Sequence, residues 1–427
     1  WEGKPNVLTG EKEVELVGGS LNIDDKHKRF AEHLDATVSW MAGRDETRTS
    51  SQTFLSDGSV FGRLQEAHRN KDFNTSVTNT FGIPKIYLNF GTTGGYFRQD
   101  GHGLSRSATF SSDPIAFGSC LQIIDSLFAP TVAAGLQQIN INRVHDQTKF
   151  GSTSYNLGQS IDWEKGLPWG DEMTVKLTGS YGKDKRDAFS RYDLTYSDPT
   201  GAPDKQDRFT PYRHHNYEYG ADILYRMNLY GGWFIDYGYN HTQRYDDSNG
   251  PLYRLDALGL GLDFGVLPSQ AEYLQTIDVD NSYQSHYMTR THRALLAARR
   301  IHDRGAYKYM YGIVANLIYK NESLHYWLAG QSYDKREGNL LVEPMIYFQC
   351  RPNGNGKLWF KLSYDSQQTT PNLVQLIDII DTSNPLAIKH GNPNLKVGVR
   401  HHAHLELGRG KYGSYLGTIL DVNIIDN

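Results

Sequence analysis

Histidines are concentrated in one short segment near the end of the chain, Arg400-His401-His402-Ala403-His404. If this segment is a β-strand, His402 and His404 lie on one face, about 7 Å apart. Two imidazoles on one face can ligate a transition metal, but a third ligand has to come from a neighbouring strand. The alternative is a polar wall whose histidines hydrogen-bond to water or to another part of the protein. We adopt that alternative, expect no bound metal, and keep His402 and His404 as the metal candidates.

Three other groups of residues could bind a ligand. His214-His215 opens a predicted strand and has the same two interpretations. The segment Tyr245 to Gly250 offers several oxygen ligands of the kind that calcium prefers, and a solvated loop explains it equally well. The predicted loop residues Tyr326, Trp327 and Tyr333 could stack on a sugar or another flat ligand, or they could be isolated exposed aromatics.

The motifs of common enzyme classes are absent from the sequence. There is no P-loop, no His-Glu-x-x-His and no Gly-x-Ser-x-Gly. We therefore predict that the protein is not an enzyme, with no catalytic residues and no cofactor. The sequence does not identify the ligand-binding residues.

Apolar and polar residues alternate with a period of two along much of the chain. From Tyr217 to Leu229 every odd position is apolar, aromatic or small, while the even positions include Glu218, Asp222 and Arg226. This pattern predicts a strand with one greasy and one wet face, odd residues outward and even residues inward. After Tyr230-Gly231-Gly232 it restarts, which indicates a hairpin. About 13 segments share the pattern, and many exceed the ~10 residues needed to cross a bilayer.

The connections between these segments alternate in length. Short turns are predicted near 82–84, 165–170, 230–232, 303–305, 353–356 and 409–411, and long polar connections over 99–140, 183–213, 246–281 and 366–394. Short turns on one side and long loops on the other are typical of outer-membrane β-barrels, whose short side is periplasmic. A soluble sandwich or propeller also alternates, but its strands are shorter and its turns more frequent.

The composition agrees with a barrel wall. Hydrophobic residues make up only 38% of the 427 residues, yet 12% are aromatic and the mean hydropathy is -0.58, as expected when half of each strand faces water. The formal net charge of -4 gives no reason to expect a nucleic-acid partner. The chain begins at Trp1 without a signal peptide, which we expect to have been cleaved or to lie outside the chain.

Two segments and the two cysteines need separate treatment. The segment 292–301 has helical propensity, but its place before a predicted turn favours a strand. The segment 113–136, with two prolines and an apolar patch, is predicted to be a folded extracellular loop with a short helix. Cys120 lies in a predicted outer loop and Cys350 beside a predicted periplasmic turn, so we expect no disulfide between them.

The segment Thr382 to Lys396, TSNPLAIKHGNPNLK, resembles a loop-to-strand signature of TonB-dependent outer-membrane receptors, closest to the Bacteroidetes receptor-type barrels. Asn384-Pro385-Leu386, Gly391-Asn392-Pro393 and Leu395-Lys396 carry the match, whereas Val397-Gly398 replaces the Pro-Glu that commonly follows. The prolines and glycine predict a loop that turns back before a strand over 396–408. A second match covers 54–77, where an extracellular excursion returns as a strand.

The resemblance implies an all-β transmembrane antiparallel barrel of about 22 strands closed by a plug. Residues 1–427 would form a partial barrel domain with about 13 strands, and the plug would lie outside the chain. The implied function is uptake of a scarce nutrient in the bacterial outer membrane, powered through TonB acting on the plug. The implied partners are membrane lipid, lipopolysaccharide, TonB and the plug. The alternative is a non-transporting barrel that serves as a scaffold for surface lipoproteins.

Overall fold

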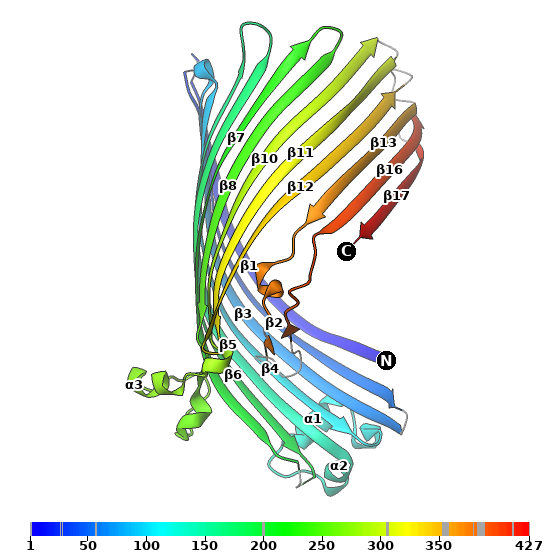
Figure 1. Ribbon diagram of the computed structural model, residues 1–427. Coiled ribbons are helices and arrows are strands. Elements are labelled where there is room, and N and C mark those ends of the chain that lie inside the picture. The colour runs from blue at the N-terminus through cyan, green and yellow to red at the C-terminus, as the bar shows by residue number, and fades with distance from the viewer. Residues whose placement is uncertain are drawn as a thin grey trace.

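The computed structural model describes residues 2–25, 27, 29–55, 58–198, 201–304, 307–351, 358–378, 380–381, 389–411 and 414–426. Long antiparallel strands dominate it and form one strongly curved sheet (Figure 1). The strands are β1 (Glu2–Asp24), β2 (Ala31–Leu55), β3 (Gly58–Ile83), β4 (Leu88–Phe110), β5 (Asn140–Gly166), β6 (Glu172–Tyr196), β7 (Asp204–Leu229), β8 (Trp233–Gly250), β9 (Tyr253–Arg254), β10 (Tyr283–Arg304), β11 (Tyr307–Leu328), β12 (Gln331–Arg351), β13 (Leu358–Thr369), β14 (Ile380–Asp381), β15 (Lys389–His390), β16 (Gly398–Lys411) and β17 (Ser414–Asp426).

The main sheet follows the order of the sequence. It runs β1-β2-β3-β4-β5-β6-β7-β8-β10-β11-β12-β13-β16-β17, with the short β9 attached to β7. Every neighbouring pair is antiparallel, and β14 pairs with β15 in a separate two-stranded sheet. The sequence-based expectation of an all-β antiparallel barrel wall is confirmed, although the 15 strands of the sheet exceed the 13 or so expected from the sequence.

The alternation in β7 sorts its side chains as predicted. Tyr217 lies opposite Tyr181 and Tyr245 in the neighbouring strands, so aromatics of three strands share one face. Phe209, an odd residue of the same strand, packs under Tyr253 of the connection that carries α3. Figure 1 shows α3 on the convex side of the sheet. The odd residues of β7 therefore face outward and the even ones face the concave side.

Two aromatic belts bound an apolar band on the convex face. Near the short turns, Trp233 packs edge-on against Tyr311 with ring centroids 5.7 Å apart. In the second belt, Tyr217 stacks on Tyr245 at 5.1 Å, and Tyr319 stacks on His292. Eight residues separate Tyr311 from Tyr319 along β11, which is roughly 26 Å of strand and about 20 Å along the membrane normal at a tilt of ~40°.

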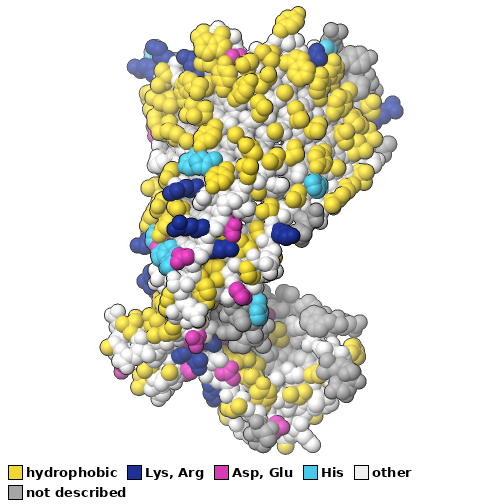
Figure 2. All heavy atoms as spheres, in the orientation of Figure 1, with side chains coloured by type: hydrophobic (Ala, Val, Ile, Leu, Met, Phe, Trp, Pro, Cys, Tyr) yellow, Lys and Arg dark blue, Asp and Glu magenta, His cyan; other side chains and the backbone are white. Residues whose placement is uncertain are grey.

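Lipid is the environment that this band fits. Ile313, Ala315 and Leu317 lie between the belts on β11, and Ile313 and Leu317 are exposed. Figure 2 shows hydrophobic side chains crowded over the upper part of the sheet, near the short turns, and charged and histidine side chains below them. An exposed apolar band with aromatic borders is the mark of an outer-membrane barrel wall. The chain is thus an outer-membrane protein that crosses the bilayer with strands.

The helices are short and lie in the connections. They are η1 (Pro84–Ile86), η2 (Pro114–Phe117), α1 (Cys120–Leu127), α2 (Ala134–Ile139), η3 (Leu255–Leu258), α3 (Gln270–Tyr273), η4 (Leu274–Thr276), η5 (Val279–Asn281) and η6 (Leu373–Leu376). None of the helices among the described residues has the length and apolar character needed to span a membrane.

The connection between β4 and β5 is folded, as the sequence predicted. Ser119 caps α1 through a reciprocal capping box with Gln122, which satisfies the free amide groups of the first turn. Ile123, Ile124 and Leu127 of α1 are buried against Ala108 and Phe110 of β4 and Leu136 of α2. The segment 292–301 is confirmed as strand, since it lies within β10.

All four predicted long connections are shorter than expected, since β4 continues to Phe110 and β13 to Thr369. The region 183–213 is mostly strand, because β6 continues to Tyr196 and β7 begins at Asp204. The region 246–281 loses its first residues to β8, which ends at Gly250. Beyond the membrane both faces of a strand meet water, so the apolar alternation that marks a strand disappears although the backbone pairing continues.

The structure describes the second half of the resemblance motif and both cysteines. Asn384-Pro385-Leu386 lies outside the described residues, as does the predicted turn at 353–356. The Leu395 amide bonds to the Asn392 carbonyl at 3.3 Å, a turn that precedes β16 at Gly398. Cys120 in α1 and Cys350 in β12 are both free thiols, so the prediction of no disulfide is confirmed.

One short turn is held to the wall by a buried carboxylate. The Tyr225 hydroxyl donates to Asp171, and the Asn228 amide donates to it at 2.8 Å. These two donors hold the pKa of the Asp171 carboxyl below its usual value, because both stabilise the charged form. The turn between β5 and β6 is therefore tied to the end of β7.

We predict that Asp171→Asn lowers the urea midpoint of refolded protein at pH 7. A carboxyl with a lowered folded-state pKa contributes stability above its unfolded pKa, roughly pH 4, and loses it as the pH falls through the folded value. The gap between variant and wild type should therefore close in acid. A gap that is the same at pH 7 and pH 3 would contradict the proposed role of the charge.

A second prediction tests the orientation of β7. Ile223→Arg should destabilise the folded barrel in lipid vesicles by about 2–4 kcal/mol, because it places a charge near the middle of the apolar band. Asp222→Arg, one residue away on the concave face, is the control and should cost much less. Equal costs for the two variants in a denaturant titration would show that the faces are assigned wrongly.

Candidate functional site

The concave face is lined by charges that pair with one another. Asp236 of β8 is buried and binds both Arg226 of β7, at 2.9 Å, and Arg299 of β10. Arg226 also binds Glu172 of β6 at 3.1 Å. Four neighbouring strands thus share one network of two cations and two anions. A wall of this kind can face water without leaving a buried charge unpaired.

Other polar side chains of the concave face are paired in the same way. Lys176 binds Asp162 at 3.3 Å, and Lys308 binds Asp303 at 3.3 Å. Asp222 accepts from the Asn240 amide at 3.2 Å. These groups are satisfied within the wall.

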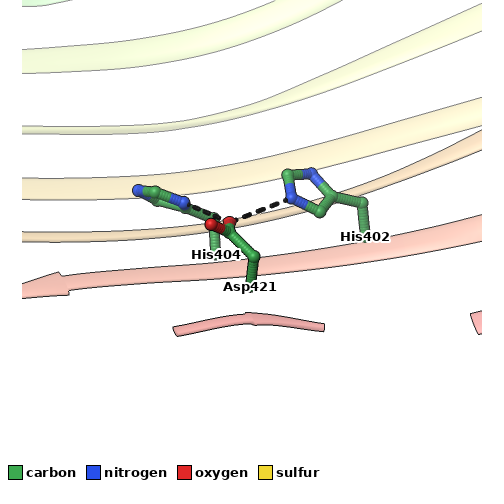
Figure 3. Close-up of side chains that lie close together, drawn as sticks. All are labelled: His402, His404 and Asp421. Carbon is green, nitrogen blue, oxygen red and sulfur yellow. Dashed lines mark hydrogen bonds and ion pairs between the residues drawn. The ribbon is translucent and has the colours of Figure 1, made fainter. Parts of the chain in front are cut away.

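The structure brings His402 and His404 together with a third potential ligand. Asp421 of β17 reaches them from the neighbouring strand (Figure 3). Its Oδ1 lies 2.6 Å from His404 Nδ1 and 3.3 Å from His402 Nε2, and the potential ligand atoms all lie within 4.8 Å of one another. Both histidines lie on the concave face, because His404 pairs with Ser363, which lines a concave-face pocket together with Arg226 and Asp236.

A second carboxylate lies near the other ring nitrogen of each histidine, the one that does not face Asp421. His402 Nδ1 lies 3.0 Å from Asp365 Oδ1, on β13. His404 Nε2 lies 3.7 Å from Glu406 Oε2, two residues further along β16. The side chains of His402 and His404 are 27% and 16% exposed, so they are held partly out of water. The sequence analysis identified the two histidines but missed both aspartates, which only strand pairing brings into range.

The side chains of His214 and His215 lie on opposite faces of the sheet. His214 lies between Asp184, at 2.9 Å, and Asp246, at 3.4 Å, whereas His215 points to the other face, 4.0 Å from Asp247. Arg244 also binds Asp246, at 2.7 Å. His214 therefore lies between two carboxylates of the concave wall, and one of them also binds an arginine.

The sequence analysis placed two groups of ligand-binding candidates in loops, and this is wrong because both groups lie in strands. The calcium candidate 245–250 is the end of β8 and not a loop, so Asp246 and Asp247 project from opposite faces. The aromatic candidates are strand residues as well. Tyr326 and Tyr333 pack against the buried cluster formed by Leu324, Leu328, Leu373, Leu376 and Ile377, so they do not form an open stacking surface.

No family model matches the chain, and no curated protein matches it. Solved structures similar to it include the ferric-catecholate import receptor Fiu from E. coli K12, at 10% identity and TM-score 0.43, over 92% of this chain and 58% of that chain. The RagAB peptide importer is 9% identical, with TM-score 0.35, over 95% of this chain and 52% of that chain. The ferric preacinetobactin receptor BauA from Acinetobacter baumannii is 7% identical, with TM-score 0.20, over 95% of this chain and 75% of that chain.

The chain thus spans just over half the length of Fiu and of the RagAB chain. At these levels of similarity the class of protein rests on the chain's own strand pairing and apolar band. These features define an outer-membrane β-barrel wall.

We predict that Asp236→Asn destabilises the folded protein by about 1.5–3 kcal/mol, the usual range for hydrogen bonds to a charged group. The variant leaves two guanidinium groups beside a neutral amide. A double-mutant cycle with Arg299→Gln should show coupling between the two positions. Strictly additive effects on the free energy of unfolding would mean that the ion pair contributes nothing.

Proposed function

We propose that this chain is part of the barrel domain of a TonB-dependent receptor that imports a scarce nutrient across the outer membrane. The observation that carries the proposal is the polar, charge-paired concave face behind an apolar convex face. A wall of that kind fits a wide, water-filled lumen. The resemblance at Gly391 to Lys396 supports the assignment to receptors of this type.

The proposed gating follows from the paired charges. A plug domain, supplied by sequence outside this chain, would occupy the lumen against the concave wall. Because Arg226 and Asp236 already satisfy each other, the plug would bind through contacts that water can replace. A pull from TonB could then move the plug without exposing unpaired charges in the wall.

Lipopolysaccharide is the proposed partner outside the barrel. Lys183 follows the second aromatic belt on the outward face of β6, two residues beyond Tyr181. Lys185 and Arg213 lie beside it, and both bind Asp187, at 3.3 Å and 2.7 Å. Three cations and one carboxylate at the level of the outer headgroups fit the phosphates of that lipid.

The test is nutrient-dependent growth. We expect deletion of the complete gene to abolish growth on one limiting nutrient among siderophore-bound iron, haem, cobalamin, glycans and peptides. Deletion of TonB should reproduce the defect, and a plasmid copy of the gene should rescue only the first strain. Normal growth on every source, combined with loss of a surface lipoprotein from the membrane, would contradict uptake and favour the scaffold.

A further inference from the structure

We propose that His402, His404 and Asp421 bind one divalent transition-metal ion, with zinc as the best fit, on the lumen wall of the barrel. The site links β16 to β17 directly and reaches β13 through Asp365. The proposal does not depend on whether the barrel imports a nutrient.

The distances fit such an ion. Zinc binds nitrogen and carboxylate oxygen at about 2.0–2.2 Å, so tetrahedral ligands lie roughly 3.4 Å from one another. Asp421 Oδ1 already lies 2.6 Å from His404 Nδ1 and 3.3 Å from His402 Nε2. Small rotations of the side chains would place an ion where the shared hydrogen bonds now run (Figure 3).

The outer carboxylates are the second, independent observation. Metal-bound histidines usually donate their other ring N–H to a carboxylate, which fixes the ring and its tautomer. Asp365 takes that place for His402 at 3.0 Å, and Glu406 lies 3.7 Å from the far nitrogen of His404. The His402 ring therefore has the supporting carboxylate of a metal ligand, while Glu406 lies close to the His404 ring without a hydrogen bond to it.

Two arrangements satisfy both nitrogens of His402. Both nitrogens of His402 face carboxylate oxygens, at 3.0 Å and 3.3 Å, but a neutral imidazole carries only one N–H. A metal on Nε2 removes the conflict, because Nδ1–H then donates to Asp365. The alternative is a doubly protonated imidazolium that bridges two aspartates without any metal.

The donor set limits the kind of ion. Two imidazoles and one carboxylate suit zinc, nickel or copper and are poor ligands for magnesium and calcium, which take oxygen. Three protein ligands leave a fourth position open toward the lumen. Among the described residues, this is the only group of at least three histidine, cysteine or carboxylate side chains close enough together to hold a metal ion. His214 also lies between two aspartates, but no second histidine completes a set there.

The experiment uses the full-length protein extracted from outer membranes and stripped with a chelator. Zinc chloride is titrated against a chromophoric competitor, and cobalt chloride gives a visible spectrum that reports the ligand geometry. We expect one ion per chain and a tetrahedral cobalt spectrum. His404→Gln and Asp421→Asn should weaken zinc at least 100-fold, and Asp365→Asn should weaken it about 10-fold.

His214→Gln is the matched control, since it removes a histidine with two aspartate neighbours elsewhere on the same wall and should leave zinc binding unchanged. Strand circular dichroism and heat-modifiable gel mobility verify the fold of each variant. If His404→Gln does not fold, Asp421→Asn and Asp365→Asn decide the question. Failure of the stripped wild type to bind zinc at micromolar concentration, or equal binding by wild type and folded ligand variants, overturns the proposal in favour of the imidazolium bridge.

Discussion

Backbone hydrogen bonding in lipid is the constraint on which the rest of this structure depends. No water is available in the bilayer core, so each strand must satisfy its amide and carbonyl groups through its neighbours. The chain meets this demand by pairing each main strand with the strands nearest in sequence, in one antiparallel sheet. Because the backbone is satisfied in this way, the side chains on one face of the sheet can be polar, which explains why so polar a sequence can cross a membrane.

The convex and concave faces of the sheet meet different environments. The convex face carries apolar side chains between the aromatic belts, where Trp233 and Tyr311 mark one border. The concave face carries charge, and it stays stable because charges such as Asp236 and Arg299 meet across strands. The histidine site resembles these ion pairs, since its ligands also come from adjacent strands of the concave face.

The sequence predicted the membrane-facing parts of the fold well, because lipid imposes a strict period of two there. It predicted the orientation of Ile223 and Asp222 and the helix at Ile123 and Ile124 from local patterns alone. It failed over 183–213, where water on both faces removes the pattern. It also missed Asp365 and Asp421, because partners separated by 17 to 37 residues are set by strand register, which alternation alone does not fix.

The length of the strands beyond the second belt has a consequence for how a solute would approach. β7 begins at Asp204, thirteen residues before Tyr217, or roughly 40 Å of hydrogen-bonded strand. This outer part of the protein is therefore hydrogen-bonded sheet that continues beyond the aromatic belt, and not a set of loose loops. A solute that approached from outside would meet this ordered rim before it reached the level of the membrane.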